Sequence, residues 1–511
     1  MKISEGARQF LGITAAVVLI LMIPAIVNGS PFIFFDSDQY FTVGQRIFET
    51  LFGGTGAPSD MAAPVAAAGP AATPDAGGGL AALAGGRAPT YSFFLYFVSV
   101  LTSLWVVAAI QSVICALLIV RFWQLARGAL RWRPILLIAG ALSLLNGLGF
   151  HAAFMMPDVF AGSLVLALAI FLYFRPAGRI ENILLVGGSF IMATLHTTNL
   201  LLVVCALIAA TLIMLVERKP IQTLLGRLGA VAGIAIAAVA FNAAYVTSVK
   251  FISGDQVRSP PYLMARLLGD GTGEAYLAKH CVDGARPFAA CAYAGIDFYN
   301  HDAFLWEPRA GGFQTADNEL RAALSAEEVR FVLAVITADP GAQLAASVAN
   351  FLQQLTAAGL QEIHYGVAAI AQTDAWNADG ILRLIPGAQA CKTAGNCVSP
   401  PLGDFWSSVV QWVNLLVLPV FAVFAVWLFS IGKSSLAGMS DSDRTLLRAA
   451  FFIALMMLAN AAICGVLSSV NNRYQARIIW SLALAMFAFA PVMLTTFQSR
   501  FPAGPAADRA G

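Results

Sequence analysis

The stretch that decides the fold is FLGITAAVVLILMIPAIVNGSPFIFFDSDQY, residues 10–40. Its apolar run from Phe10 to Val27 is long enough to cross about 30 Å of hydrocarbon. Two carboxylates, Asp36 and Asp38, follow at the point where the chain should leave the lipid. No small-residue cleavage site lies cleanly behind the run and more apolar runs follow, so we expect a retained signal anchor.

The rest of the chain has the composition of a membrane protein. Hydrophobic residues make up 59% of the 511 residues and only 11% are charged, which excludes an ordinary soluble globular protein. We predict an all-α polytopic membrane protein with about ten transmembrane helices. The predicted spans are residues 10–28, 92–120, 134–150, 159–174, 182–197, 199–216, 228–247, 407–430, 449–468 and 478–497.

Lys and Arg gather in alternate loops, and this bias predicts the orientation. Both termini are expected in the cytoplasm of a bacterial inner membrane protein, and Asp36 and Asp38 are expected outside. Three regions follow: an N-terminal transmembrane domain (1–247), an exterior domain (248–405) and C-terminal transmembrane helices (406–511). The first outer loop of the N-terminal domain carries the candidate site.

Cysteine positions agree with this orientation, because four of the seven fall in the predicted exterior domain. An even number there is typical of an oxidising compartment. Among the three possible connectivities we favour the local pairs, Cys281 with Cys291 and Cys391 with Cys397; four free thiols are the alternative.

Local patterns predict further elements. YFTVGQRIFETLF, residues 40–52, has the apolar spacing of an amphipathic helix in the membrane interface. Residues 53–86 are almost all Ala, Gly and Pro and predict a mobile tether. Polar patches at 151–158 (HAAFMMPD) and 196–199 (HTTN) each break a long apolar run into two short spans.

Helix signals predict a mostly helical exterior domain. A capping box from Ser325 to Glu328 predicts that a helix begins there, and Pro340 suits the first turn of the next helix.

Polar residues at the outer edges of the predicted spans form the candidate site. Charged groups at such depth are costly and usually serve a water-filled site. Carboxylates, histidines and arginines from different spans suit proton abstraction beside phosphate recognition. The candidates are Asp36, Asp38, Arg87, Tyr91, His151, Asp158, His196, Asn199, Arg473 and Arg477.

Each candidate also has an ordinary structural interpretation. An aspartate such as Asp158 is a preferred N-cap, and one of the carboxylates at 36 and 38 could cap the helix that follows. The histidines suit a membrane interface, and Tyr91 suits an aromatic belt. Arg473 and Arg477 share a helix face and could extend to lipid head groups, although they defy the positive-inside bias.

The pattern of Asp-x-Asp beyond the first span, an interfacial helix, RAPTY at 87–91 and PD at 157–158 resembles the GT-C glycosyltransferases. These integral membrane enzymes use polyprenyl-phosphate-linked sugars and often carry a soluble outer domain. The resemblance covers about the first 200 residues. It departs from the family pattern in the Ala/Gly-rich tether at 53–86.

The resemblance implies roles for the candidates. Asp36 or Asp38 would be the general base, and Asp158 a second acidic residue of the site. Arg87, Arg473 or Arg477 would meet the lipid phosphate. The acceptor would be a glycan, a lipid or a protein.

A divalent metal is a further possibility for the site. Asp36, Asp38 and Asp158 would suit Mg²⁺ or Mn²⁺, and nearby histidines would suit Zn²⁺; no other cofactor is expected. Besides the lipid-linked sugar and its acceptor, the expected partners are membrane lipids, and no nucleic-acid partner is expected.

Three other functions stay open at this point. The same charges could line the pathway of a lipid-linked sugar transporter or flippase, although such a pathway predicts ionisable residues midway through several spans. An O-antigen ligase or polymerase-like enzyme would also join lipid-linked glycans outside. A non-enzymatic assembly protein would use its exterior domain to bind a partner.

Overall fold

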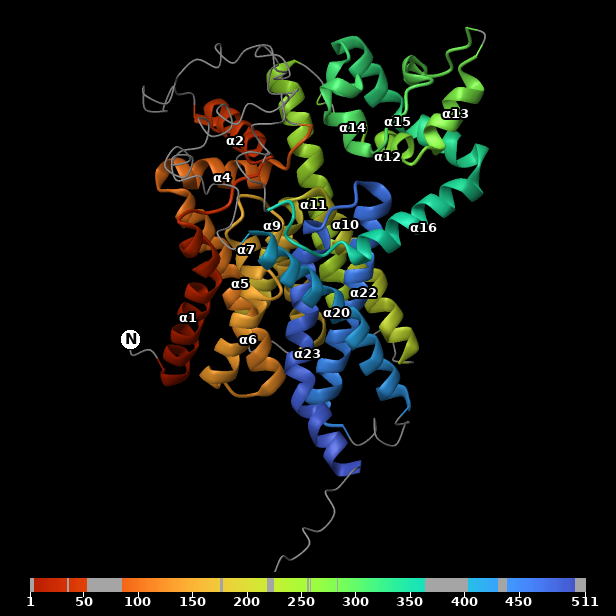
Figure 1. Cartoon of the computed structure of the whole chain (residues 1–511). Helices are drawn as coiled ribbons and strands as arrows, with labels where there is room; N and C mark the ends of the chain where they lie inside the picture. Colours follow the sequence, from red (N-terminus) through yellow and green to blue (C-terminus); the bar gives the residue numbers. More distant parts are fainter. Residues whose placement is uncertain are drawn as a thin grey trace, which may run out of the picture.

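The computed structural model shows a helical bundle with a group of shorter helices at one end (Figure 1). Among the described residues all regular structure is helical, apart from one isolated bridge between Phe32 and Phe154. The structure describes residues 4–34, 36–52, 85–174, 178–217, 225–254, 257, 259–282, 284–363, 403–430 and 439–500.

Seven helices of the described residues are long and apolar enough to cross a membrane. The prediction of an all-α polytopic membrane protein is therefore confirmed. These helices are α1 (Glu5–Asn28), α5 (Leu104–Arg127), α10 (Thr197–Val216), α11 (Leu225–Ser253), α20 (Gly403–Ser430), α22 (Asp441–Leu467) and α23 (Arg473–Arg500).

The three other predicted spans fall on shorter helices. They are α6 (Trp132–Leu144), α8 (Val159–Tyr173) and α9 (Arg179–Thr194), with 13, 15 and 16 residues. The predicted span 92–120 was wrong as a single helix: α4 (Pro89–Leu101) ends before Thr102 and Ser103, and α5 begins after them.

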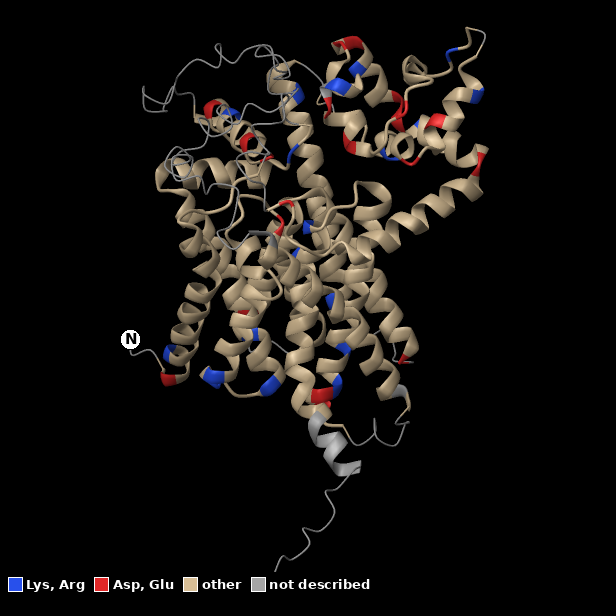
Figure 2. Cartoon of the chain, in the orientation of Figure 1, with Lys and Arg blue, Asp and Glu red and all other residues tan. Residues whose placement is uncertain are grey.

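The helices alternate in direction, and this brings one set of their ends together. We call this the site end of the bundle: α1, α9 and α22 finish there, and α8, α10 and α23 begin there. Figure 2 shows many Lys and Arg residues at the opposite end, where α1 begins. The short helix α7 (Leu148–Ala152) ends inside the predicted break at 151–158. The predicted break at 196–199 begins between α9 and α10 and runs into the first turn of α10.

The link after α1 is tied firmly to the turn before α8. Gly29 ends α1 in the left-handed conformation, with φ of 82°, which glycine adopts without strain. Phe32 N–H then donates to Ala153 O over 2.9 Å, and Met155 N–H donates to Phe32 O over 2.8 Å. The Ser37 hydroxyl donates to Met155 O over 3.0 Å. These bonds place Asp36 on the same side of the bundle as the start of α8.

The predicted interfacial helix is present as α2 (Ser37–Phe52), and it packs against α4. The contact is close at Gly44, where a Cβ atom would lie 2.0 Å from the carbonyl oxygen of Ser92. Leu51 and Phe52 at its far end are exposed. The predicted tether at 53–86 lies almost entirely outside the described residues.

Residues 259–363, without residue 283, form what we call the helical cap, which sits at the site end (Figure 1). It has a core of its own that includes Phe298, Phe304 and Phe331. Its helices are α12 (Tyr262–Gly269), α13 (Thr272–His280), η3 (Ala289–Tyr293), α14 (His301–Trp306), η4 (Pro308–Ala310), η5 (Phe313–Thr315), α15 (Asn318–Ala338) and α16 (Pro340–Thr356).

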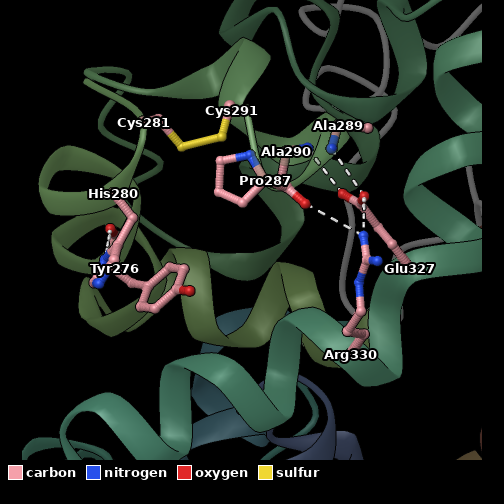
Figure 3. The surroundings of a disulfide bond; sticks show 9 residues. All are labelled: Tyr276, His280, Cys281, Pro287, Ala289, Ala290, Cys291, Glu327 and Arg330. Atoms are coloured by element: carbon pink, nitrogen blue, oxygen red, sulfur yellow. Dashed lines mark hydrogen bonds and ion pairs between the residues drawn. A yellow bond between two sulfur atoms is a disulfide. The ribbon is translucent and has the colours of Figure 1, made fainter. Parts of the chain in front are cut away.

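Figure 3 shows the disulfide between Cys281 and Cys291, which confirms the first of the two predicted pairs. The second pair, Cys391 and Cys397, lies outside the described residues. Near the disulfide, Glu327 accepts hydrogen bonds from the backbone N–H groups of Ala289 and Ala290, so it holds η3 against α15.

The predicted capping box at Ser325 was wrong. Helix α15 begins earlier, at Asn318, because the carboxylate of Asp317 accepts from Leu320 N–H as an N-cap. Glu328 instead accepts from Leu263 N–H at the start of α12. Pro340 does occupy the first position of α16, as predicted.

Candidate functional site

Five of the predicted charged residues come together at the site end. Asp36 precedes α2, Arg87 precedes α4 and Asp158 precedes α8, while Arg473 and Arg477 lie in the first turns of α23. Four different parts of the sequence therefore supply one charged cluster.

These five side chains form an ion-pair chain in the order Arg87, Asp36, Arg473, Asp158, Arg477. Arg87 Nη2 donates to Asp36 Oδ1 over 2.5 Å. Arg473 bridges the two carboxylates, with Nη2 3.7 Å from Asp36 Oδ2 and Nη1 3.5 Å from Asp158 Oδ2. Arg477 Nη1 completes the chain, 3.5 Å from Asp158 Oδ1. Buried charges need such partners, because an unpaired one costs several kcal/mol.

Within the ion-pair chain, side-chain exposure rises from Arg477 toward Asp36. The side chains of Arg477 and Asp158 are 0% and 1% exposed, and that of Arg473 is 7% exposed. Asp36 retains 22% exposure. Among the five groups it is therefore the carboxylate that a bound molecule could reach from solvent.

The two carboxylates do not accept hydrogen bonds from all N–H groups of the three arginines. Among the described residues, no hydrogen-bond acceptor meets the buried Nε atoms of Arg87, Arg473 and Arg477. Nη1 of Arg473 faces Asp158 Oδ2 at 3.5 Å without a hydrogen bond. The ion-pair distances at Arg473 are long, and its guanidinium donates a hydrogen bond to Tyr474 Oη over 3.4 Å. Buried N–H donors normally have acceptors, and oxygen-rich anions are the acceptors that guanidinium groups bind most strongly.

Aromatic rings cover the guanidinium groups. The Cζ atom of Arg473 lies 4.5 Å from the ring centre of Phe34 and 4.9 Å from that of Tyr474. Arg87 lies over Tyr40 at 5.6 Å and over Trp306 of the helical cap at 6.0 Å. Such faces stabilise a cation while they exclude water.

The sequence analysis did not predict these contacts between arginines and aromatic rings. Tyr474, which lies beside Arg473 and three residues before Arg477, is the ring that a search for aromatic neighbours of the arginines could have found.

Asp158 does not act as an N-cap, although it stands at the N-cap position of α8: its side chain makes no capping hydrogen bond there. Its carboxylate instead faces Arg473 and Arg477. Arg477 is held further by Thr198 Oγ1 and Asn460 Oδ1, both 3.1 Å from its Nη2. Neither of these two was singled out in the sequence.

The helical cap fixes the start of α23. Glu362 accepts hydrogen bonds from the backbone N–H groups of Asn472, over 2.8 Å, and Arg473, over 3.1 Å. A carboxylate at this position satisfies donors that the first turn of a helix leaves free. Glu362 thus positions Arg473, and no sequence pattern links it to a helix more than 100 residues away.

The uncharged candidates have mainly local roles. His196 is the N-cap of α10, and its Nδ1 accepts from Thr198 N–H over 3.2 Å. Asn199 donates to Met192 O, which closes the turn between α9 and α10. The Tyr91 hydroxyl is buried and donates to Gln111 Oε1 over 3.2 Å. These hydrogen bonds tie the three side chains to neighbouring turns and helices of the bundle.

His151 differs from them. It is fully buried in α7, and neither ring nitrogen has a hydrogen-bond partner among the described residues.

Asp38 lies in the first turn of α2, and its buried Oδ1 meets no donor among the described residues. Burial, together with the nearby negative charge of Asp36, raises the pKa of Asp38 to about 7. Asp38 is thus a carboxyl group that changes charge near neutral pH.

The hypothesis of a metal ion finds no ligand set in the described parts of the chain. They contain no group of three or more His, Cys, Asp or Glu side chains placed to hold an ion. Asp36 and Asp158 form ion pairs with arginines.

No model of a known protein family matches the sequence, and no curated protein or solved structure shows significant similarity to it.

Asp38 gives a prediction about stability. Between the ordinary carboxyl pKa and about 7 the folded chain keeps a proton on Asp38 that the unfolded chain loses, so stability should fall as pH rises through this window. Thermal unfolding in detergent at several pH values between about 4 and 8 measures the effect. Asp38→Asn should lose less stability over that range than the wild type.

The matched control is Glu49→Gln, at the other end of α2, where the carboxylate forms an ion pair with Arg46. It should keep the wild-type pH dependence. Identical pH dependence for Asp38→Asn and the wild type would contradict the prediction.

Proposed function

We propose that the chain is a membrane glycosyltransferase of the GT-C type, which moves a sugar from a polyprenyl-phosphate donor to an acceptor hydroxyl. One observation carries this proposal: arginine N–H groups that meet no acceptor among the described residues lie beside a carboxylate that solvent can reach, at the end of a membrane bundle. The unfilled donors suit a phosphate whose lipid tail stays in the bilayer, and the carboxylate suits a general base.

In this proposal the arginines bind the donor phosphate. Arg87 and Arg473 both contact Asp36, so a phosphate that fills their free donors would lie close to that carboxylate. Charge-assisted hydrogen bonds from guanidinium groups stabilise the negative charge that develops on a departing phosphate. The aromatic rings over them limit access of water.

Asp36 is the base we favour. Its carboxylate takes the proton from the acceptor hydroxyl as the hydroxyl oxygen bonds to the anomeric carbon. The bond between that carbon and the phosphate oxygen breaks, and its electron pair leaves with the polyprenyl phosphate. Because attack and departure occur on opposite faces of the sugar, the configuration at the anomeric carbon inverts.

Asp158 has a different role in this scheme. It is 1% exposed and lies between two arginines, so it holds Arg473 and Arg477 in place instead of accepting a proton from the substrate. Asp38 lies in the first turn of α2, where its buried Oδ1 meets no donor among the described residues, and it adjusts the charge beside Asp36.

We also propose that the site end faces the periplasm of a bacterial inner membrane, with both termini in the cytoplasm. The Lys and Arg bias supports this orientation, and so does the disulfide of the helical cap, because disulfides persist in oxidising compartments.

The orientation predicts the behaviour of reporter fusions. A reporter enzyme that works only in the periplasm should be active when inserted near residue 300. A reporter that works only in the cytoplasm should be active when placed at residue 440. A periplasmic signal at residue 440 would reverse the orientation and place the ion-pair chain on the wrong side for a periplasmic acceptor.

The catalytic proposal is tested with Asp36→Asn. Loss of a general base typically lowers a rate by ~10² to 10⁴, while the substitution keeps the shape of the side chain. Transfer of labelled sugar from polyprenyl-phosphate donors should therefore almost cease in purified Asp36→Asn protein.

Glu49→Gln is the control, because it alters a carboxylate of α2 in an exposed ion pair and should retain wild-type transfer. Thermal unfolding checks that both variants are folded. Normal turnover by folded Asp36→Asn protein would rule out Asp36 as the base.

A further inference from the structure

Helix α16 of the helical cap turns polar side chains toward the protein and apolar side chains outward, which is the reverse of a helix on a water-soluble surface. The residues that it turns toward the protein are polar: Gln343, Asn350 and Gln354 are all less than 10% exposed. Its outer face is largely apolar: Leu344, Val348 and Leu352 are 66%, 47% and 54% exposed, and Gln353 is an exposed polar residue beside them. A helix beside water normally shows the opposite arrangement.

The inner polar face is fully used by the protein. Gln343 Oε1 accepts from the Thr272 hydroxyl over 2.6 Å, and Asn350 Nδ2 donates to Asp270 over 2.9 Å. Gln354 exchanges two hydrogen bonds with the backbone of Asn471, between α22 and α23. These bonds fix the rotation of α16, so the apolar face must point outward.

The outer face carries no charge. Between residues 331 and 356 the sequence contains one charged residue, Asp339, and it caps the start of α16. Figure 2 shows α16 without Lys, Arg, Asp or Glu along its length. Exposed apolar surface without interspersed charges marks a binding surface.

The face is continuous with the membrane bundle. Helix α16 bends by 107° from α15 and runs down to the site end, where it packs against the span α22 (Figure 1). The contact is close: a Cβ on Gly465 of α22 would lie 2.7 Å from the carbonyl oxygen of Asn350. Gly465 lies near the site end of the candidate span α22, so α16 meets the bundle close to where lipid head groups would surround it.

We propose that α16 is a monotopic membrane anchor, whose face of Leu344, Val348 and Leu352 lies in the lipid leaflet at the site end. Apolar faces of interfacial helices enter the bilayer by about 5–10 Å. The lipid would then hold the helical cap, with Trp306 and Glu362, over the ion-pair chain. The inference needs only the membrane bundle and does not depend on the proposed enzymatic activity.

The test uses the full chain in nanodiscs with a fluorophore on a single introduced cysteine. Val348→Cys and Leu352→Cys place the label on the proposed anchor, and Glu319→Cys places it in the exposed first turn of α15. The parent chain, in which Cys115 and Cys464 are buried and Cys205 is half-buried, gives the labelling background. Iodide in water and lipids brominated near the head group are the two quenchers.

Labels at 348 and 352 should be quenched by the brominated lipid and protected from iodide, and the label at 319 should show the reverse. Two results would overturn the proposal. Iodide quenching at 348 and 352 equal to that at 319 would place the face in water. Protection from iodide without quenching by the brominated lipid would show that protein covers the face, either another segment of this chain or a second copy.

Discussion

The structure at the site end depends on burying three positively charged arginines at the end of a membrane bundle. Burying guanidinium groups costs several kcal/mol each unless anionic partners are close, and Asp36 and Asp158 are those partners. Neither aspartate lies near the arginines of α23 in the sequence. Much of the local architecture at the site end brings these groups together and holds them there.

Three sets of contacts serve that purpose. The hydrogen bonds between Phe32 and the turn at 153–155 bring Asp36 to the side of Asp158. Close packing at Gly44 holds α2 on α4, and Arg87 enters the cluster from the start of α4. From the other side, Glu362 and Gln354 of the helical cap fix the start of α23. The site is thus made rigid by both the bundle and the cap.

Much of the fold could be predicted from the sequence because hydropathy acts locally. The seven long spans follow from apolar runs, and charges at one set of helix ends indicated Asp36, Arg87, Asp158, Arg473 and Arg477 together. Helix boundaries were harder: the run 92–120 looked continuous, yet the chain breaks at Thr102 and Ser103.

The sequence-based predictions failed where a residue's role depends on a partner that is distant in the sequence. Ser325 and Glu328 match a capping box, but Asp317 caps the helix earlier and Glu328 serves α12. Glu362, Thr198 and Asn460 reach the site only through folding.

The central claim is that a lipid phosphate binds the arginine N–H groups of the ion-pair chain that meet no acceptor among the described residues. Native mass spectrometry of the purified protein with polyprenyl phosphate and with the uncharged polyprenol tests it directly. The wild type should bind the phosphate more tightly than the alcohol, and Arg473→Gln should lose that preference while it binds the alcohol as before. Equal binding of both lipids by the wild type, or an unchanged preference in Arg473→Gln, would contradict the account.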